Sequence, residues 1–167
     1  MNNIYLIGFM GTGKTTVAHA LAKKIHWQVV DTDQYIVEKM QMSIPEIFEE
    51  YGEERFREIE TEVLTEISEK DQQIISCGGG VAMRENNVRI MKEHGTTVLL
   101  SATPQTILHR VKKDKNRPLL KGRKTVEGIR ELMEERVPAY EAAADYKIVS
   151  DGRAAYRIAR EIQTILR

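Results

Sequence analysis

The sequence has little cysteine and no excess of charge of either sign. Because Cys77 is the single cysteine, no disulfide can form within the chain, and a fold held together by disulfides is excluded. The 25 lysines and arginines balance 25 aspartates and glutamates. A neutral chain lacks the broad field that would hold it on nucleic acid or on an anionic membrane. Any anion that it binds must therefore be held by a site built for that purpose.

Long apolar runs are also missing, and none approaches the roughly 20 residues of a membrane span. The apolar stretch near the N-terminus follows no basic residue and precedes no small-residue cleavage site, which argues against a signal peptide. We therefore expect a cytoplasmic protein. Repeats and low-complexity segments are absent, and 41% of the 167 residues are hydrophobic. These properties predict a single domain, residues 1–167, with its own core.

Short apolar runs alternate with helical patterns along the chain. The runs are Ile4–Ile7, Gln28–Val30, Ile74–Cys77, Thr96–Leu100 and Tyr146–Val149. Several are almost wholly apolar, as expected for strands that are covered on both faces. Strands that alternate with helices predict an α/β fold, a five-stranded parallel sheet with helices on both faces.

Four amphipathic stripes at helical spacing separate these runs. They are Val17, Leu21 and Ile25; Ile59, Val63 and Ile67; Val126, Ile129 and Met133; and Ile158, Ile162 and Ile165. Ser43 and Glu46 have the spacing of a capping box, and Thr103-Pro104 is typical of a helix start. We expect Pro138 to end or kink the third helix near Val137.

The segment Gly8–Thr15, GFMGTGKT, matches the phosphate-binding pattern G-x-x-x-x-G-K-[ST] between a predicted strand and a predicted helix. Glycines let the backbone amides turn inward around an anion, and the helix start adds its positive dipole end. Lys14 can reach the terminal phosphates, and the Thr15 hydroxyl can bind Mg²⁺. The alternative is a chance glycine turn, which the flanking strand and helix disfavour.

Phosphate loops of this kind serve switches, motors and kinases alike. The sequence has no Asn-Lys-x-Asp motif for reading guanine, and no apolar run ending in Asp-Glu, as a motor ATPase would usually have. A small kinase is therefore the leading class.

Three further groups of residues stand where a second substrate could bind. Asp31 and Asp33 follow the second predicted strand, at the edge where ligands bind in open parallel sheets; capping of a helix near Gln34 would explain Asp33 but not Asp31. Arg57 and Glu60 share one helix face, and this spacing alone favours a surface ion pair. The glycines 78–80 end the third strand, where they could admit a ligand or form a plain loop.

The basic stretch 112–124 has neither helical nor strand periodicity. It could be a solvated surface loop or a functional lid, because long loops within compact domains are often functional.

Taken in order, the motifs resemble those of the shikimate kinase family over nearly the whole chain. They are Gly8–Thr15, Asp31-Thr32-Asp33, Phe56–Glu60, Gly78-Gly79-Gly80, Arg117–Leu120 and Glu135–Tyr140. The resemblance implies a fold of the nucleoside-monophosphate-kinase type with strand order 2-3-1-4-5. It also implies phosphoryl transfer from ATP to shikimate, within aromatic amino-acid biosynthesis, by a monomer with one Mg²⁺.

The same resemblance assigns a role to each site residue. The nucleotide-binding residues are Gly11, Thr12, Gly13, Lys14, Thr15, Thr16, Arg110, Arg117 and Arg153. The shikimate-binding residues, part of them in the region 33–60, are Asp33, Arg57, Gly78, Gly79, Gly80 and Arg136. Thr15 would bind the metal and Asp31 would support it through water. Lys14, Asp33 and Arg117 would be catalytic, with Arg117 on a lid formed by residues 112–124.

One departure and three alternatives remain. Ala154-Ala155 follows Arg153 where relatives often have a proline that packs on adenine, which leaves the adenine contact open. A gluconate kinase would share the phosphate loop but not the triple glycine with Arg57 and Arg136. A nucleotide switch without catalysis would be expected to have damaged the loop or its acids. A nucleic-acid-dependent ATPase would need net positive charge.

Overall fold

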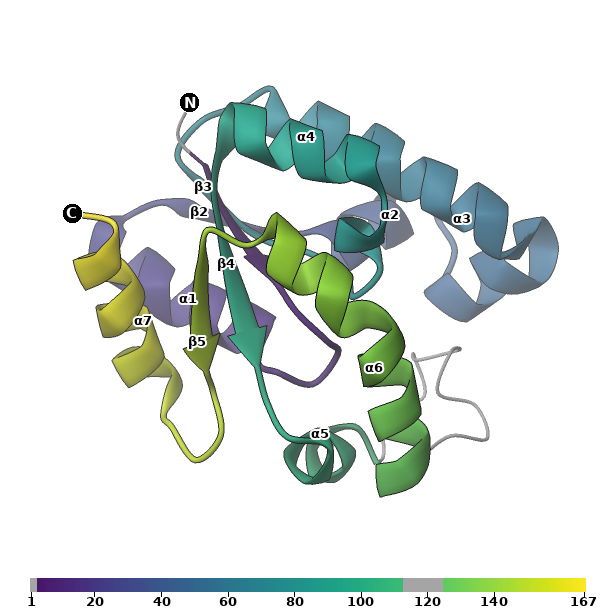
Figure 1. The fold of residues 1–167 in the computed structure, drawn as a ribbon. Helices are drawn as coiled ribbons and strands as arrows, with labels where there is room; N and C mark the ends of the chain where they lie inside the picture. The colour runs from purple at the N-terminus through teal and green to yellow at the C-terminus, as the bar shows by residue number, and fades with distance from the viewer. Residues whose placement is uncertain (1–2, 113–124) are drawn as a thin grey trace.

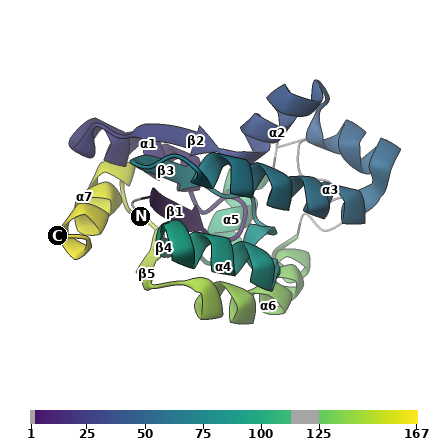
Figure 2. The same ribbon diagram turned by 90° about the horizontal axis from the view of Figure 1, so that it is seen from above.

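Five parallel strands form one sheet in the order β2-β3-β1-β4-β5 (Figures 1 and 2). The structure is a computed structural model that describes residues 3–112 and 125–167. The strands are β1 (Asn3–Ile7), β2 (Gln28–Asp31), β3 (Gln73–Ser76), β4 (Gly95–Ser101) and β5 (Tyr146–Val149). All five predicted strands are confirmed, and so is the order that the family resemblance implied.

Helices cover both faces of this sheet. They are α1 (Lys14–Ile25), α2 (Thr32–Met40), α3 (Ile44–Ser68), α4 (Glu85–His94), α5 (Pro104–Val111), α6 (Val126–Ala143) and α7 (Ala155–Ile165), with a short 3₁₀ turn η1 (Val81–Met83). Figure 2 shows α1 and α7 on one side of the strands and α4 and α6 on the other. Among the described residues, no helix is long and apolar enough to cross a membrane.

Side chains that alternate along β1 divide the interior into two apolar layers. Ile4 and Leu6 pack with α1 and α7, whereas Tyr5 and Ile7 pack with α3, α4 and α6. A strand buried on both faces needs apolar residues at consecutive positions, which explains the continuous apolar runs in the sequence. The carboxyl ends of the five strands then share one edge of the sheet, and the loops that follow them build the site.

The expectation for Pro138 was wrong in one respect, because α6 does not end there. The helix runs from Val126 through Pro138 to Ala143. Proline removes one backbone donor from a helix, but buried residues on both sides, Leu132 and Tyr140 among them, pack the two halves as one helix. As a result, Arg136 and Tyr140 stay one helical turn apart.

The predicted helix starts are confirmed. The Ser43 hydroxyl accepts the Glu46 amide at 3.3 Å, and the Thr103 hydroxyl accepts the Thr106 amide at the same distance. The sequence did not predict α4, whose buried residues are only Asn87 and Met91 and therefore leave no apolar stripe.

Candidate active site

The predicted phosphate loop connects β1 to α1 at the carboxyl edge of the sheet. Gly8, Gly11 and Gly13 have φ values of 143°, 77° and 95°, which side chains on L-residues rarely allow. A Cβ atom on Gly8 would also lie only 2.2 Å from the Leu100 carbonyl oxygen. Because α1 begins at Lys14, its positive dipole end points into the loop. The backbone is therefore shaped to bind an anion.

Lys14 and Arg110 bring cationic groups to this loop. The Lys14 Nζ donates to the carbonyl oxygens of Gly8 at 2.8 Å and of Phe9 at 3.0 Å. Arg110, from α5, donates to the Gly11 carbonyl oxygen at 2.9 Å. Thr12 is buried, and its hydroxyl donates to the Phe9 carbonyl oxygen at 2.9 Å, while Thr16 is exposed in the first turn of α1. The residues predicted to bind nucleotide phosphates thus lie together.

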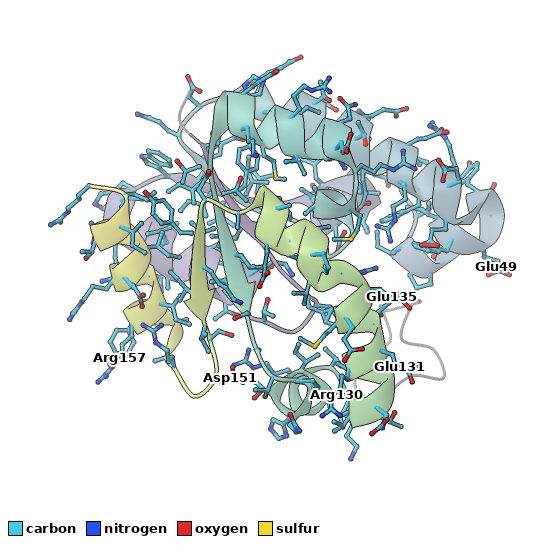
Figure 3. All side chains as sticks on the ribbon, in the orientation of Figure 1. Glu49, Arg130, Glu131, Glu135, Asp151 and Arg157 are labelled. Carbon is cyan, nitrogen blue, oxygen red and sulfur yellow. The ribbon has the colours of Figure 1, made fainter. Side chains whose placement is uncertain are left out.

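Arg153 lies on the loop between β5 and α7. Its guanidinium donates to the Val149 carbonyl oxygen and pairs with Glu161 of α7. The same loop meets α5 twice: Arg110 reaches the Ser150 hydroxyl at 3.5 Å, and Asp151 (Figure 3) accepts the Thr103 amide at 3.0 Å. Of the two arginines expected near the adenine, Arg110 therefore contacts the phosphate loop, whereas Arg153 lies on a loop that contacts α5. Of the proposed lid, residues 112–124, only Lys112 belongs to the described residues, so Arg117 lies outside them.

Thr15 and Asp31 meet beside the phosphate loop. The Thr15 hydroxyl donates to Asp31 Oδ2 at 2.7 Å and lies 3.0 Å from the Ser76 hydroxyl. Asp31 and Ser76 are register partners on the neighbouring strands β2 and β3. Hydroxyl and carboxylate oxygens near a phosphate site suit Mg²⁺, which usually takes one or two carboxylates, substrate phosphates and water. The residues present therefore fit this ion.

Two details of this corner differ from the sequence interpretation. Asp31, not Asp33, is the N-cap of α2, and its Oδ1 accepts the Gln34 amide at 3.1 Å. The capping explanation for Asp33 was therefore wrong, because α2 begins at Thr32, two residues earlier than that explanation requires. Ser76 was missed altogether. Its only signal was a polar residue at the end of an apolar strand, and its proximity to Thr15 depends on the order of the strands.

Asp33 faces the glycine loop 78–80. A Cβ atom built on Gly78 would lie 2.6 Å from Asp33 Oδ1 and 3.1 Å from Glu60 Oε2. One on Gly79 would lie 2.9 Å from Arg136 Nη1, and one on Gly80 only 2.2 Å from an Arg57 guanidinium nitrogen. These short distances show that four charged side chains approach the glycine backbone closely, as expected if the loop admits a ligand. The charged groups gather around this backbone.

The two arginines approach the glycine loop from α3 and α6. Arg57 Nη1 lies 2.6 Å from Glu60 Oε1, and the Glu60 side chain is only 1% exposed. The pair is therefore not the surface ion pair that the spacing alone favoured. Arg136 is 6% exposed, and its guanidinium lies over the Phe9 ring, 5.8 Å from the centroid. Two guanidinium groups with little exposure to solvent, placed beside one loop, suit a planar carboxylate.

Burial raises the pKa of the Glu60 carboxyl from 4.5 to about 7, although the neighbouring Arg57 guanidinium acts in the opposite direction. Folding therefore favours the protonated form. This contribution to stability is complete below pH 4.5 and is lost as the pH rises through about 7.

We expect Glu60→Gln to remove this part of the pH dependence. Urea unfolding at about pH 5 and about pH 8 checks it. The free energy of unfolding should decrease more in the parent protein than in the variant between these two conditions. Equal decreases would mean that Glu60 titrates alike in the folded and unfolded chains.

Burial also raises the pKa of the Cys77 thiol, which is 1% exposed just before the glycines. The side chain packs with apolar residues of the core. Cys77 therefore has the character of a small buried residue rather than of a nucleophile.

The fold and site together define the class. A parallel sheet with a phosphate loop between β1 and α1, beside a glycine loop surrounded by two arginines and carboxylates, is the arrangement of a P-loop kinase for a small molecule.

Comparison with known proteins identifies the family. The family model for shikimate kinase (SKI) matches residues 10–167. A shikimate kinase from Thermodesulfovibrio yellowstonii is 43% identical over 97% of this chain and 93% of its own length. One from Geobacter sulfurreducens is 42% identical over 99% and 91%. The chain belongs to the shikimate kinase family.

Solved structures agree. The shikimate kinase from Acinetobacter baumannii in complex with shikimate superposes with a TM-score of 0.95 at 37% identity, over 99% of this chain and 93% of that one. The Aquifex aeolicus enzyme gives a TM-score of 0.85 at 39% identity, over 98% and 95%.

Proposed function

We propose that the protein transfers the γ-phosphoryl group of ATP to the 3-hydroxyl of shikimate, giving shikimate 3-phosphate and ADP. The observation that carries this proposal is the placement of Asp33, Arg57 and Arg136 around one glycine loop, next to the phosphate loop. In the family this reaction belongs to aromatic amino-acid biosynthesis. The family, and the shikimate complex of the Acinetobacter baumannii relative, support the same acceptor.

On the nucleotide side, the amides of the phosphate loop and Lys14 would bind the β- and γ-phosphates. Thr15 and Asp31 would hold one Mg²⁺, Asp31 through water. The ion would neutralise charge on the phosphate oxygens when bound. Phosphoryl transfer has a loose transition state, so the alignment and the fixed charges of these groups supply most of the catalysis.

On the acceptor side, Arg57 and Arg136 would bind the shikimate carboxylate, with the Gly79 amide beside them. Glu60 would hold Arg57 in place from its buried position. Asp33 would accept a hydrogen bond from the hydroxyl that is phosphorylated, which orients it and draws away its proton. The ring is then fixed at both ends, with the reacting oxygen toward the γ-phosphate.

Several finer assignments stay predictions. These are contact of Arg117 with phosphate, closure of the segment 112–124 over both substrates, adenine contacts from Arg110 and Arg153, a monomeric state and a cytoplasmic location. Ala154-Ala155 stands where relatives often have a proline. This difference affects the adenine contact and not the proposed activity.

The metal assignment predicts a difference between two conservative variants. Thr15→Val removes the hydroxyl at nearly constant volume, and we expect it to raise the Mg²⁺ concentration for half-maximal activity about tenfold or more. Thr15→Ser keeps the hydroxyl and should stay near the parent value. Titration of activity with Mg²⁺ at saturating ATP and shikimate measures both. Equal values for the two variants would remove Thr15 from the metal site.

An acceptor comparison tests the proposed function. ADP release is followed by a coupled assay with shikimate, with gluconate and without an acceptor. We expect turnover with shikimate and only background release in the other two reactions. Turnover with gluconate instead would indicate the alternative kinase. Release that no acceptor increases would indicate a nucleotide switch or an ATPase.

A further inference from the structure

Two buried hydroxyl groups hold the glycine loop 78–80 from opposite sides. Thr32, in the first turn of α2, is fully buried, and its hydroxyl accepts the Gly78 amide at 2.8 Å. Tyr140, on α6, is 3% exposed, and its hydroxyl donates to the Gly79 carbonyl oxygen at 2.6 Å. Neither residue has a part in the transfer described above.

Thr32 fixes the peptide group that precedes Gly78, whereas Tyr140 fixes the peptide group between Gly79 and Gly80. The Gly78 carbonyl oxygen accepts the Val81 amide at 3.1 Å, and the Gly79 carbonyl oxygen accepts Tyr140. The carbonyl and N–H of one planar peptide group point in opposite directions. Therefore the Gly79 and Gly80 N–H groups are turned away from Val81 and Tyr140 respectively.

Those two N–H groups are available to a ligand. Neither donates a hydrogen bond to another residue within 3–112 and 125–167. Arg136 borders the Gly79 position and Arg57 borders the Gly80 position. Two successive amides beside two guanidinium groups can both donate to an anion. A buried backbone N–H group without an acceptor lowers the stability of the fold, unless a ligand or water accepts its hydrogen bond.

We propose that Thr32 and Tyr140 are positioning residues for the acid group of the acceptor. Tyr140 orients the Gly80 N–H toward the carboxylate that Arg57 and Arg136 bind, and Thr32 anchors the start of the loop that carries the Gly79 N–H. Tyr140 is suited to this role because it lies one turn after Arg136 on α6, which continues through Pro138. One helix thus supplies both a guanidinium for the ligand and a hydroxyl for the loop. This inference rests on the proposed function for the identity of the acid.

Tyr140→Phe tests the proposal with the loss of one oxygen atom. We expect the KM for shikimate to rise about three- to tenfold, as for loss of one hydrogen bond, while the KM for ATP stays unchanged. Thr32→Val should act in the same direction, and Thr32→Ser, which keeps the hydroxyl, should restore the parent KM. Thermal unfolding confirms that each variant is folded.

Tyr5→Phe is the matched control. Tyr5 is also buried, and its hydroxyl is bonded to the Ser68 hydroxyl at 2.7 Å, away from the glycine loop. This variant should lose stability but keep both KM values. The comparison separates loss of a buried tyrosine hydroxyl in general from loss of the bond to Gly79.

A direct readout is the shift of the Gly79 and Gly80 amide signals in ¹H–¹⁵N spectra on adding shikimate. The shift should be clear in the parent protein and smaller in Tyr140→Phe. An active, folded Tyr140→Phe protein with the parent shikimate KM would overturn the inference, and so would an equal rise in both KM values. Failure of the parent protein to phosphorylate shikimate would instead overturn the proposed function.

Discussion

Replacement of Lys14 by alanine is expected to lower kcat by on the order of a hundredfold to a thousandfold, the usual effect of deleting one fixed donor to developing charge. The Lys14 ammonium lies at the phosphate loop, within 3.0 Å of the Gly8 and Phe9 carbonyl oxygens. Alanine leaves the glycine backbone in place and removes the charge opposite the β- and γ-phosphates. Steady-state rates at saturating ATP and shikimate measure the loss.

Lys23→Ala is the matched control for this experiment. Lys23 is exposed in the last turn of the same helix, α1, at the end opposite to the phosphate loop. Its removal should leave kcat unchanged. A folded Lys14→Ala protein with near-normal turnover would contradict the assignment of Gly8–Thr15 as the phosphate-binding loop.

Removal of Arg57 or of Arg136 is expected to weaken shikimate binding much more than ATP binding. A hydrogen bond to a charged group contributes about 1.5–3 kcal/mol, so Arg57→Ala and Arg136→Ala should each raise the shikimate dissociation constant about tenfold or more. Isothermal titration with each ligand measures this split. The melting temperature of each variant should also be measured, because Arg57→Ala removes the ion-pair partner of the buried Glu60 and could destabilise the fold.

Two exposed arginines on the same helices provide controls. Arg55 on α3 pairs with the exposed Glu58 and Glu62, and Arg130 projects from α6 at the protein surface (Figure 3). Their alanine variants should bind both ligands normally. A shikimate analogue without the carboxylate should bind the parent protein and the Arg57→Ala and Arg136→Ala variants alike. Equal losses for the analogue would mean that the two arginines maintain the structure rather than bind the acid.

The sheet and the phosphate loop could be predicted from sequence because their signals are local. A strand buried on both faces shows itself as a continuous apolar run, such as Ile4–Ile7. The glycines of the phosphate loop mark positions that need positive φ, and Gly8, Gly11 and Gly13 have it. Both signals arise within a few residues of the chain.

The rest of the site depends on contacts between distant segments. Thr15 and Ser76 meet only because β3 pairs with β1, and Tyr140 reaches Gly79 only because α6 packs over the glycine loop. Local rules also misjudged Pro138, where packing on both sides preserves the helix. The spacing of Arg57 and Glu60 is the same for a surface ion pair and for a buried one. It therefore could not predict that Glu60 is buried beside the glycine loop.

Identification of the product tests the central claim most directly. The protein is incubated with ATP, Mg²⁺ and shikimate, and the new phosphoester is examined by ³¹P NMR with correlation to ring protons. The account predicts ADP and one phosphoester, whose phosphorus couples to the proton on C3 of shikimate. Formation of inorganic phosphate with shikimate unchanged, or a phosphoester at another hydroxyl, would contradict it.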